Sequence, residues 1–231
     1  MKILDLFCGA GGSSMGYHLA FPEAEIVGID IHPQPRYPFQ FFQADAIEFC
    51  KKYGAQFDLI HASPPCQFAS DITPDKSKHI NLIPDVMDAM SISEEIRCEA
   101  QLTVIENVPR ASRYLMNPII LCGKKFGLKT YRHRAFSVTP DIPEPLHIDH
   151  DDSTPPANRS GGLEANLSPK GFISCVGGGS RTHQVGRRDI FEYRKQAMGI
   201  DWMNRYELAQ AIPPAYTKYI GEQLKLVTQL E

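Results

Sequence analysis

The segment Asp5-Leu6-Phe7-Cys8-Gly9-Ala10-Gly11-Gly12 carries the strongest fold signal in the chain. It joins an apolar run, predicted to be a strand over Ile3–Phe7, to a helical pattern over Ser13–Ala20. Glycines at such a turn let a ligand lie close to the backbone, and the N–H groups of the following helix face that ligand. The turn therefore predicts a site for a nucleotide-containing cofactor. On its own it fits nicotinamide or flavin cofactors as well as S-adenosylmethionine.

Outward from this turn, the first half of the chain alternates short apolar runs with helical patterns. The predicted strands are Ile3–Phe7, Glu25–Ile31, Phe57–Ala62 and Leu102–Glu106, and the predicted helices are Ser13–Ala20, Ala46–Tyr53 and Ile83–Arg97. The last helix is expected to place four apolar residues on one face, namely Ile83, Val86, Met90 and Ile96. This alternation predicts an α/β fold with a doubly wound, mostly parallel sheet. Ligands of such sheets bind beyond the carboxyl ends of the strands.

The second half of the chain has a different amino-acid composition. Residues 139–186 are rich in Pro, Gly, Ser, Asp and Asn, which predicts little regular structure. Helices are expected over Asp189–Met198 and Asn204–Ala211, the second with a cap formed by Asn204 and Glu207. A final helix follows Pro213-Pro214, and its apolar face is expected to comprise Tyr216, Ile220, Leu224 and Val227.

Length and composition indicate one soluble globular domain with a small appendage. The chain has 231 residues, of which 42% are hydrophobic and 22% charged. We find no apolar run long enough to cross a bilayer and no signal-peptide pattern, and we therefore expect a cytoplasmic protein without a membrane partner. The six cysteines contain no CxxC pair, so we predict neither a metal site nor a disulfide framework.

The overall charge does not favour a nucleic-acid partner, but its distribution is uneven. The net charge of −3 gives no global attraction to phosphate. Residues 110–136, however, contain seven basic side chains and no acid. This stretch fits a phosphate-facing surface and fits a solvated basic face equally well.

Several polar residues follow the predicted strands. Asp30, after the second strand, is placed to accept hydrogen bonds from ribose hydroxyls. Asp45, after a third candidate strand, fits either a contact with an adenine amino group or the N-cap of the next helix.

Two further strand ends carry candidate chemistry. The fourth strand runs into Ser63-Pro64-Pro65-Cys66-Gln67, where two prolines hold the backbone rigid before a thiol. The fifth runs into Glu106-Asn107-Val108-Pro109, which places a carboxylate beside it. A lone cysteine is more often an inert small residue, and a glutamate here could simply cap structure. Together they fit a nucleophile and an acid.

Two later segments are weaker signals by themselves. Arg132-His133-Arg134 lies in the acid-free stretch, where guanidinium groups could bind phosphate or a base oxygen. Gln210-Ala211-Ile212-Pro213-Pro214 is typical of a helix stop followed by a turn.

Taken in order, these segments resemble the motifs of the C5-cytosine DNA methyltransferase family. The resemblance rests on DLFCGAGG, an acid after strand two, SPPCQ, ENV, an Arg-x-Arg and a C-terminal element similar to Asn-Ala-Val-Pro. It covers most of the chain except the Pro/Gly-rich segment. It implies the S-adenosylmethionine-dependent methyltransferase type of fold, with S-adenosylmethionine as cofactor and S-adenosylhomocysteine as product.

The resemblance also implies roles for individual residues. Cys66 is the expected nucleophile, Glu106 the group that protonates cytosine N3, Asn107 the residue that orients the loop, and Arg134 a contact to the base O2 or to the Cys66 loop. Asp30 is expected on ribose and Asp45 on adenine. The implied cofactor-binding residues are Phe7, Cys8, Gly9, Ala10, Gly11, Asp30, Ile31, Asp45, Ala46, Pro64, Gln210 and Ala211.

Nucleic-acid contacts are expected from four residues, namely Gln67, Ser70, Arg132 and Arg181. Arg132 is assigned to backbone phosphate, and the stretch Phe68–His79 to a lid that fills the gap left by a flipped base. Loops over 177–181 and 187–188 could touch DNA or be inert surface.

The family pattern also divides the chain into three expected regions. Residues 1–138 form the catalytic and cofactor-binding core, 139–194 a small target-recognition region or loop insertion, and 195–231 the C-terminal helices that complete the cofactor pocket. The short middle region predicts relaxed or short sequence specificity, or help from another subunit.

Departures from the family pattern are mild, and several alternatives stay open. Thr130 stands where Gln is common, Asp30 where Glu is usual, and Gln210 where Asn is usual. The same chemistry on tRNA or a free cytosine nucleotide, a non-catalytic DNA-binding relative, and a nicotinamide dehydrogenase are the competing functions. We expect a monomer, with a homodimer or a helper subunit as alternatives, in a bacterial cell or a phage-infected host.

Overall fold

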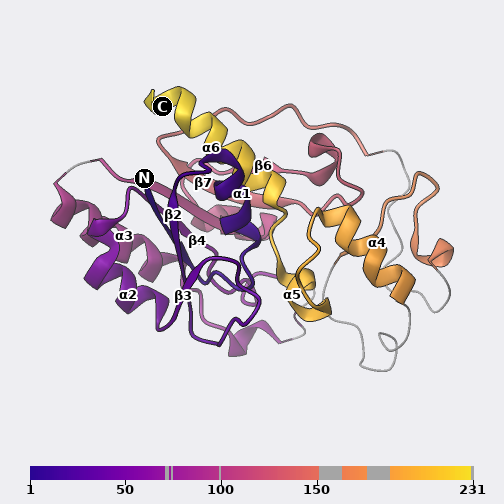
Figure 1. Ribbon diagram of the computed structural model, residues 1–231, viewed down its shortest axis with the longest axis horizontal. Coiled ribbons are helices and arrows are strands. Elements are labelled where there is room, and N and C mark those ends of the chain that lie inside the picture. The colour runs from indigo at the N-terminus through magenta and orange to yellow at the C-terminus, as the bar shows by residue number, and fades with distance from the viewer. Residues whose placement is uncertain (71–72, 74, 99, 151–162, 176–187, 230–231) are drawn as a thin grey trace.

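The fold is a mixed α/β sheet of seven strands flanked by helices on both faces (Figure 1). The computed structural model describes residues 1–231 except 71–72, 74, 99, 151–162, 176–187 and 230–231. The strand order is β3-β2-β1-β4-β5-β7-β6. The strands are β1 Lys2–Leu6, β2 Glu25–Asp30, β3 Gln40–Gln43, β4 Leu59–Ala62, β5 Leu102–Asn107, β6 Ile119–Leu121 and β7 Arg134–Thr139.

The first five strands are parallel, β7 runs against them, and β6 runs in the same direction as the first five. Pairing is parallel from β3 through β5, whereas β7 lies antiparallel to β5 and to β6. The carboxyl ends of β1, β2, β4 and β5 therefore meet at one edge of the sheet, and the amino end of β7 joins them there. Asn107 of β5 faces Ala135 of β7 in this register.

Each face of the sheet packs against a different pair of helices (Figure 1). Alternate side chains of a strand point to opposite faces, so Ile3 joins one hydrophobic cluster and Leu4 the other. The first cluster lies against α2 Ala46–Tyr53 and α3 Ile83–Arg97. The second lies against α1 Gly12–Ala20 and α6 Pro214–Thr228.

A third, smaller core joins the C-terminal helices to the described part of the Pro/Gly-rich segment. Ile173 and Met198 are buried in it, as is Ala10 of the glycine-rich turn. The helices are α4 Arg188–Met198 and α5 Arg205–Gln210. Short 3-10 turns complete the described elements at Gly54–Gln56, Lys76–Lys78, Pro109–Tyr114, Gly123–Phe126 and Glu164–Asn166.

The predicted doubly wound, mostly parallel sheet is confirmed. Helices α2 and α3 have the predicted bounds, and Asn204 and Glu207 form the predicted capping box. Strands β6 and β7 were not predicted. The expected boundary between residues 194 and 195 falls inside α4, and the division into three regions stays a prediction.

Two residues of the expected apolar helix faces are not buried. Ile96 is 61% exposed and Val227 is 45% exposed. Both side chains lie in the last turn of their helices, beyond Ser93 and Leu224, which are the last residues that α3 and α6 bury. The helical periodicity is right, but each helix runs past the sheet that it covers.

None of the helices in the described ranges combines the length and the apolar character needed to span a membrane.

The contact between α1 and α6 depends on a glycine. A Cβ on Gly16 would lie 2.0 Å from Thr217 Oγ1 and 2.2 Å from the Pro214 carbonyl oxygen. Thr217 Oγ1 cannot simply turn away, because it donates a 2.8 Å hydrogen bond to the Ser13 carbonyl. Helix α1 therefore approaches α6 closely only while position 16 lacks a side chain.

We expect Gly16→Ala to lower the free energy of unfolding by about 2 kcal/mol, because the added methyl group forces the two helices apart. The measurement is chemical denaturation followed by circular dichroism. Leu19→Ala is the matched control, since Leu19 lies on the same helix and is 51% exposed. It should change the free energy of unfolding by no more than about 0.5 kcal/mol. Equal effects of the two substitutions would contradict the close packing.

Candidate active site

The turn after β1 has the backbone geometry of a ligand-binding loop. Phe7, Gly9 and Gly11 all have positive φ, of 57°, 49° and 82°. The Cys8 N–H donates to the Ile29 carbonyl at 3.1 Å, and the Gly9 N–H donates to Asp30 Oδ2 at 3.1 Å. The predicted cofactor loop is thus attached to the carboxyl end of β2.

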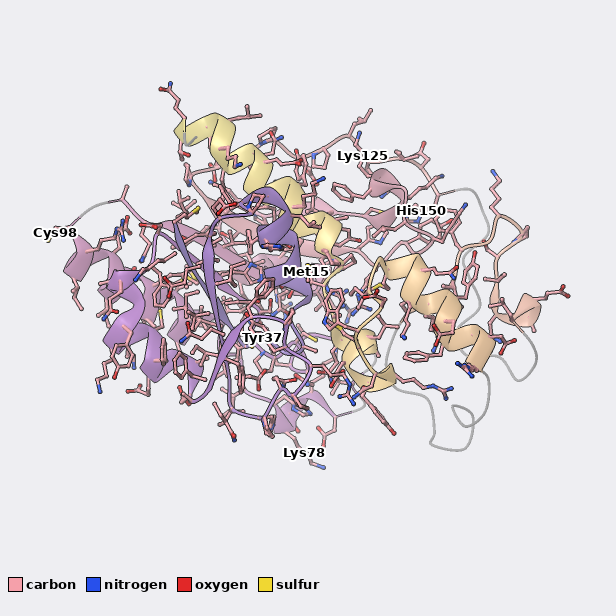
Figure 2. All side chains as sticks on the ribbon, viewed as in Figure 1. Met15, Tyr37, Lys78, Cys98, Lys125 and His150 are labelled. Carbon is pink, nitrogen blue, oxygen red and sulfur yellow. The ribbon has the colours of Figure 1, made fainter. Side chains whose placement is uncertain are left out.

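Asp5 also belongs to this site, although the sequence pattern predicts no role for it. Its side chain is fully buried, and Ser14 Oγ donates a short hydrogen bond to its Oδ2. Ser14 also lies 2.6 Å from the hydroxyl of Tyr37, on the loop between β2 and β3 (Figure 2). Among the described residues, Asp5 Oδ1 has no hydrogen-bond partner. Burial raises the pKa of Asp5 to about 7.

The C-terminal segment packs directly on the glycine-rich turn. A Cβ on Gly12 would lie 2.3 Å from the Ile212 carbonyl oxygen, so position 12 needs glycine. The Trp202 indole N–H donates to the Ala10 carbonyl at 2.8 Å. Gln210 is exposed and Ala211 is half-buried. This packing brings the predicted cofactor residues of the first strand and of the C-terminus to one place.

Asp30 and Asp45 both hold backbone. Asp30 Oδ1 accepts a 2.9 Å hydrogen bond from the His32 N–H, in addition to the bond from Gly9. Asp45 Oδ1 accepts from Ile47 N–H and Glu48 N–H at 2.9 and 3.0 Å, so Asp45 is the N-cap of α2. A carboxylate oxygen has two lone pairs, so Asp30 can accept further hydrogen bonds from a ligand, and Asp45 Oδ2 can do the same.

The remaining predicted cofactor residues differ in exposure. Ile31 is 61% exposed just beyond β2, where its side chain is open to a ligand. Ala46 and Pro64 are buried and offer packing rather than polar contacts.

Cys66 lies at the start of a helical turn just beyond β4. Its carbonyl accepts from Ala69 N–H and Ser70 N–H at 3.0 and 2.9 Å. The loop before it is held by Asn107, whose Nδ2 donates to the Pro64 carbonyl at 3.0 Å. Asn107 is buried at the end of β5, and its role in orienting the loop stays a prediction.

Glu106 and Arg134 form a buried ion pair at the same edge of the sheet. Arg134 Nε lies 3.0 Å from Glu106 Oε1, and Arg134 Nη1 donates to the His133 carbonyl at 2.8 Å. Burial raises the pKa of Glu106, while Arg134, Arg132 and a hydrogen bond from Ser63 lower it. The net effect is a raised pKa for Glu106, because burial outweighs the groups that favour its charged form, while Arg134 fixes the orientation of the carboxyl group.

A chain of hydrogen-bond donors leads to Glu106 from helix α1. The Tyr17 hydroxyl lies 2.9 Å from His61 Nδ1, and His61 Nε2 lies 2.9 Å from Ser63 Oγ. Since Ser63 donates to Glu106, His61 Nε2–H donates to Ser63, and Tyr17 donates to His61 Nδ1. Burial lowers the pKa of His61 to about 3, which keeps the imidazole neutral, as this chain requires.

The Cys66 thiol is affected electrostatically by the same pair. Burial raises the pKa of Cys66, and the Glu106 carboxylate raises it further. The guanidinium groups of Arg134 and Arg132 lower it. Three of the predicted catalytic groups are therefore close enough to influence one another, and Asn107 holds the loop that carries the thiol.

Arg132 corrects one prediction from the sequence. It is only 9% exposed and does not face phosphate. Its guanidinium donates to the carbonyl oxygens of Ala211 and Ala209 at 2.8 Å each, and to that of Cys175. Arg132 has a φ of 33°, outside the extended range of a strand. A regular strand would place Arg132 and Arg134 on one face, whereas this bend turns Arg132 toward the C-terminal segment.

The other predicted nucleic-acid residues are only partly described. Gln67 is exposed and Ser70 is half-buried. Arg181 lies outside the described residues, as do parts of the predicted lid over 68–79. In the described part of that lid, Phe68 packs edge-on against Tyr114 with ring centroids 5.6 Å apart.

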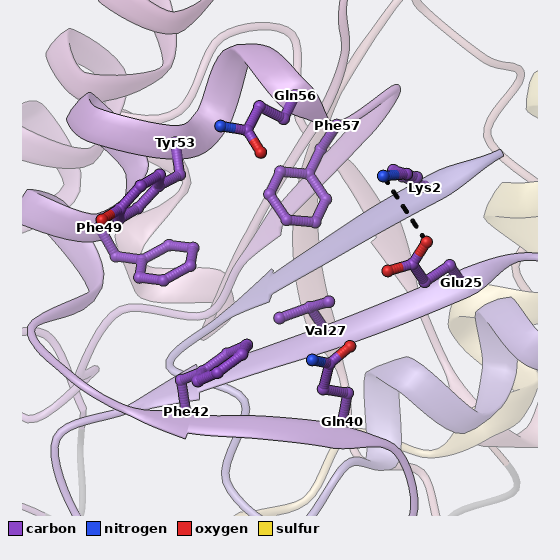
Figure 3. Close-up of a pocket in the computed structure, with 9 residues that line it drawn as sticks. All are labelled: Lys2, Glu25, Val27, Gln40, Phe42, Phe49, Tyr53, Gln56 and Phe57. Atoms are coloured by element: carbon purple, nitrogen blue, oxygen red, sulfur yellow. Dashed lines mark ion pairs between the residues drawn. The ribbon is translucent and has the colours of Figure 1, made fainter.

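A separate pocket of about 390 Å³ lies away from this site (Figure 3). It is lined by Lys2, Glu25 and Gln40, which begin β1, β2 and β3, and by aromatic side chains including Phe49 and Tyr53. Its two charged residues pair with each other at 3.7 Å and are each about half-exposed. It therefore lies at the amino ends of the strands, opposite the edge that carries Cys66 and Glu106.

Comparisons with known proteins give a distant likeness in fold. No family model and no curated protein matches the chain. Among solved structures, it is similar to a predicted O-methyltransferase from Agrobacterium tumefaciens, with 13% identity, 61% of this chain and 74% of that chain covered, and a TM-score of 0.37. It is also similar to a conserved hypothetical protein from Streptococcus pyogenes, with 16% identity, coverages of 59% and 83%, and a TM-score of 0.35. Likeness at this level does not bear on activity or substrate.

We expect Arg132→Gln to lower the free energy of unfolding by about 3 kcal/mol, because buried carbonyl groups lose their donors. Lys125→Gln is the matched control, since Lys125 is exposed in the same basic stretch. It should leave the free energy of unfolding unchanged within about 0.5 kcal/mol. Chemical denaturation measures both. If Arg132→Gln is as stable as the wild type but binds duplex DNA less tightly, the result would support the phosphate contact predicted from the sequence.

Proposed function

We propose that the chain is an S-adenosylmethionine-dependent DNA cytosine-C5 methyltransferase in which Cys66 is the nucleophile. The observation that carries this proposal is the meeting of Cys66, Glu106 and Arg134 at the carboxyl edge of the sheet, beside the glycine-rich turn. Parallel sheets of this kind bind their ligands at that edge. The motif resemblance supplies the reaction, and the geometry supports it by bringing the implied catalytic groups together.

The residues beside the glycine-rich turn fit S-adenosylmethionine. This cofactor supplies an electrophilic methyl group and carries a positively charged amino group. The buried Asp5 Oδ1, which has no partner among the described residues, is suited to accept from such a cation. Asp30 lies at the end of β2, where a ribose is expected, and Ile31 offers an exposed apolar side chain to a flat ring.

Cys66 and Glu106 together can overcome the main chemical obstacle to the reaction. Cytosine C5 is too weak a nucleophile to take a methyl group unaided. When the Cys66 thiolate adds to C6 and Glu106 supplies a proton to N3, the ring becomes an enamine with electron density at C5. Burial favours the protonated form of Glu106 that this step needs.

The later steps restore both side chains. After C5 has taken the methyl group and S-adenosylhomocysteine has formed, water accepts the C5 proton. The electron pair of that C–H bond then forms the C5–C6 double bond as the bond between the Cys66 sulfur and C6 breaks. The thiolate leaves, and the proton on N3 returns to Glu106. Arg134 holds the Glu106 side chain in place and stabilises the Cys66 thiolate by its charge.

Polynucleotide is favoured over a free nucleotide by the basic residues beside Glu106. Arg110 and Arg113 lie on the 3-10 turn Pro109–Tyr114, which follows β5 directly, and both are exposed. Such side chains can contact phosphates on either side of an extruded base. We take DNA as the substrate, and tRNA with the same chemistry is the alternative.

The direct test is mass spectrometry of nucleosides from duplex DNA and from tRNA after incubation with S-adenosylmethionine. Wild-type protein should produce 5-methylcytosine in DNA, and Cys66→Ser should lower the rate by roughly a thousandfold or more, because the adduct cannot form. Cys98→Ser is the matched control and should keep the wild-type rate, since Cys98 is exposed and outside the site. Methylation of tRNA alone would reject DNA as substrate, and methylation of neither would reject the enzyme.

A second test measures the pKa of Cys66 in the free protein. Iodoacetamide reacts with the thiolate, so in a Cys98→Ser background the alkylation rate at Cys66 should rise with pH and level off above the thiol pKa. Because Glu106 raises that pKa, Glu106→Gln should move the whole profile to lower pH and speed alkylation at pH 7.5. Arg134→Gln should move the profile to higher pH. Peptide mapping locates the modified cysteine, and profiles that do not move would show that these charges do not act on the thiol.

A further inference from the structure

Four potential metal ligands gather at the antiparallel edge of the sheet. Cys122 follows β6, His133 precedes β7, and His147 and His150 lie on the chain beyond β7. The cysteine sulfur and one ring nitrogen of each histidine all lie within 4.8 Å of one another. These residues are far apart in sequence and form no CxxC pair. The sequence pattern therefore predicts no metal site, and only the fold brings the four ligands together.

Two separations within the cluster are close to those between neighbouring ligands of a tetrahedral zinc ion, and all four ligand atoms lie within 4.8 Å of one another. Cys122 Sγ lies 3.2 Å from His150 Nε2, and His133 Nε2 lies 3.2 Å from His147 Nε2. Zinc bonds of about 2.0 Å to nitrogen and 2.3 Å to sulfur place neighbouring ligand atoms about 3.3 to 3.5 Å apart. A thiolate with three imidazoles is a donor set that suits zinc.

The surroundings hold these ligands in place. The His150 ring stacks on Tyr131 with centroids 3.7 Å apart, and Tyr131 stacks on Phe172 at 4.5 Å. Lys124 Nζ donates to the Asp149 carbonyl, which fixes the chain next to His150. His150 and the nearby Lys125 lie on the side of the molecule away from α2 and α3 (Figure 2). These contacts limit the movement of the His150 ring and of the chain beside it.

We propose that Cys122, His133, His147 and His150 form a structural zinc site. Four protein ligands fill a tetrahedral coordination sphere and leave no open position for substrate, so the site stabilises rather than catalyses. It ties the chain beyond β7 to the loop after β6 and to the residue before Arg134. The proposal does not depend on the methyltransferase assignment.

The test uses full-length protein from which any affinity tag has been removed. Elemental analysis should find about one zinc ion per chain. After zinc is replaced by Co²⁺, the absorption spectrum should show tetrahedral d–d bands and a thiolate-to-cobalt band that Cys122→Ser abolishes. Cys98→Ser should keep both, because its cysteine is outside the cluster.

His147→Asn is a second variant that should fold normally, since His147 is exposed. It should weaken zinc binding by at least about tenfold, because even residues behind the metal ligands usually contribute that much. Chelation should lower the Tm of the wild type by more than it lowers that of His147→Asn. The proposal is overturned if the protein takes up neither zinc nor cobalt, if it takes up only copper or nickel, or if Cys122→Ser and His147→Asn bind zinc as the wild type does.

Discussion

The buried carboxylate of Glu106 is the constraint on which the rest of the candidate active site depends. A charged group in the protein interior is costly unless opposite charge and hydrogen bonds compensate it. Arg134 supplies the charge from β7, and Ser63 supplies a hydrogen bond from the end of β4. Both strands are direct neighbours of β5, so the order of strands in the sheet brings the compensating groups to the carboxylate. The thiol that follows Ser63 on the same loop is thereby placed beside it.

The compensation extends into the core through a neutral histidine. His61 is fully buried inside β4, and its pKa of about 3 means that it does not change charge near neutral pH. The neutral His61 ring accepts a hydrogen bond from Tyr17 and donates one to Ser63, so it fixes the orientation of the Ser63 hydroxyl. Tyr17 lies on α1, the helix that follows the glycine-rich turn. The proposed cofactor side and catalytic side of the site therefore share one buried network, and a shift of α1 against α6 would be felt at Glu106.

The sequence predicts the parts of the molecule that local patterns determine. Helix α2 has its expected bounds because Asp45 caps it, and the Asn204 cap was equally readable. Strands β6 and β7 lack such signals, since β6 has three residues and both rely on pairing with distant chain. The Cys122 cluster has no recognisable spacing, so only the folded chain reveals it. Tyr37 was missed for the same reason, because its contact with Ser14 links the loop after β2 to helix α1.

The three consecutive residues 132–134 show why local motifs gave only part of the site. The φ of 33° at Arg132 interrupts the extended backbone just before β7. As a result Arg132 bonds the C-terminal segment, His133 joins the Cys122 cluster, and Arg134 pairs with Glu106. One short piece of backbone thus connects the segment that packs on the glycine-rich turn, the proposed zinc site and the proposed catalytic carboxyl group of Glu106. Its position must satisfy all three at once, which explains why a residue that resembles a phosphate contact in sequence is instead buried and structural.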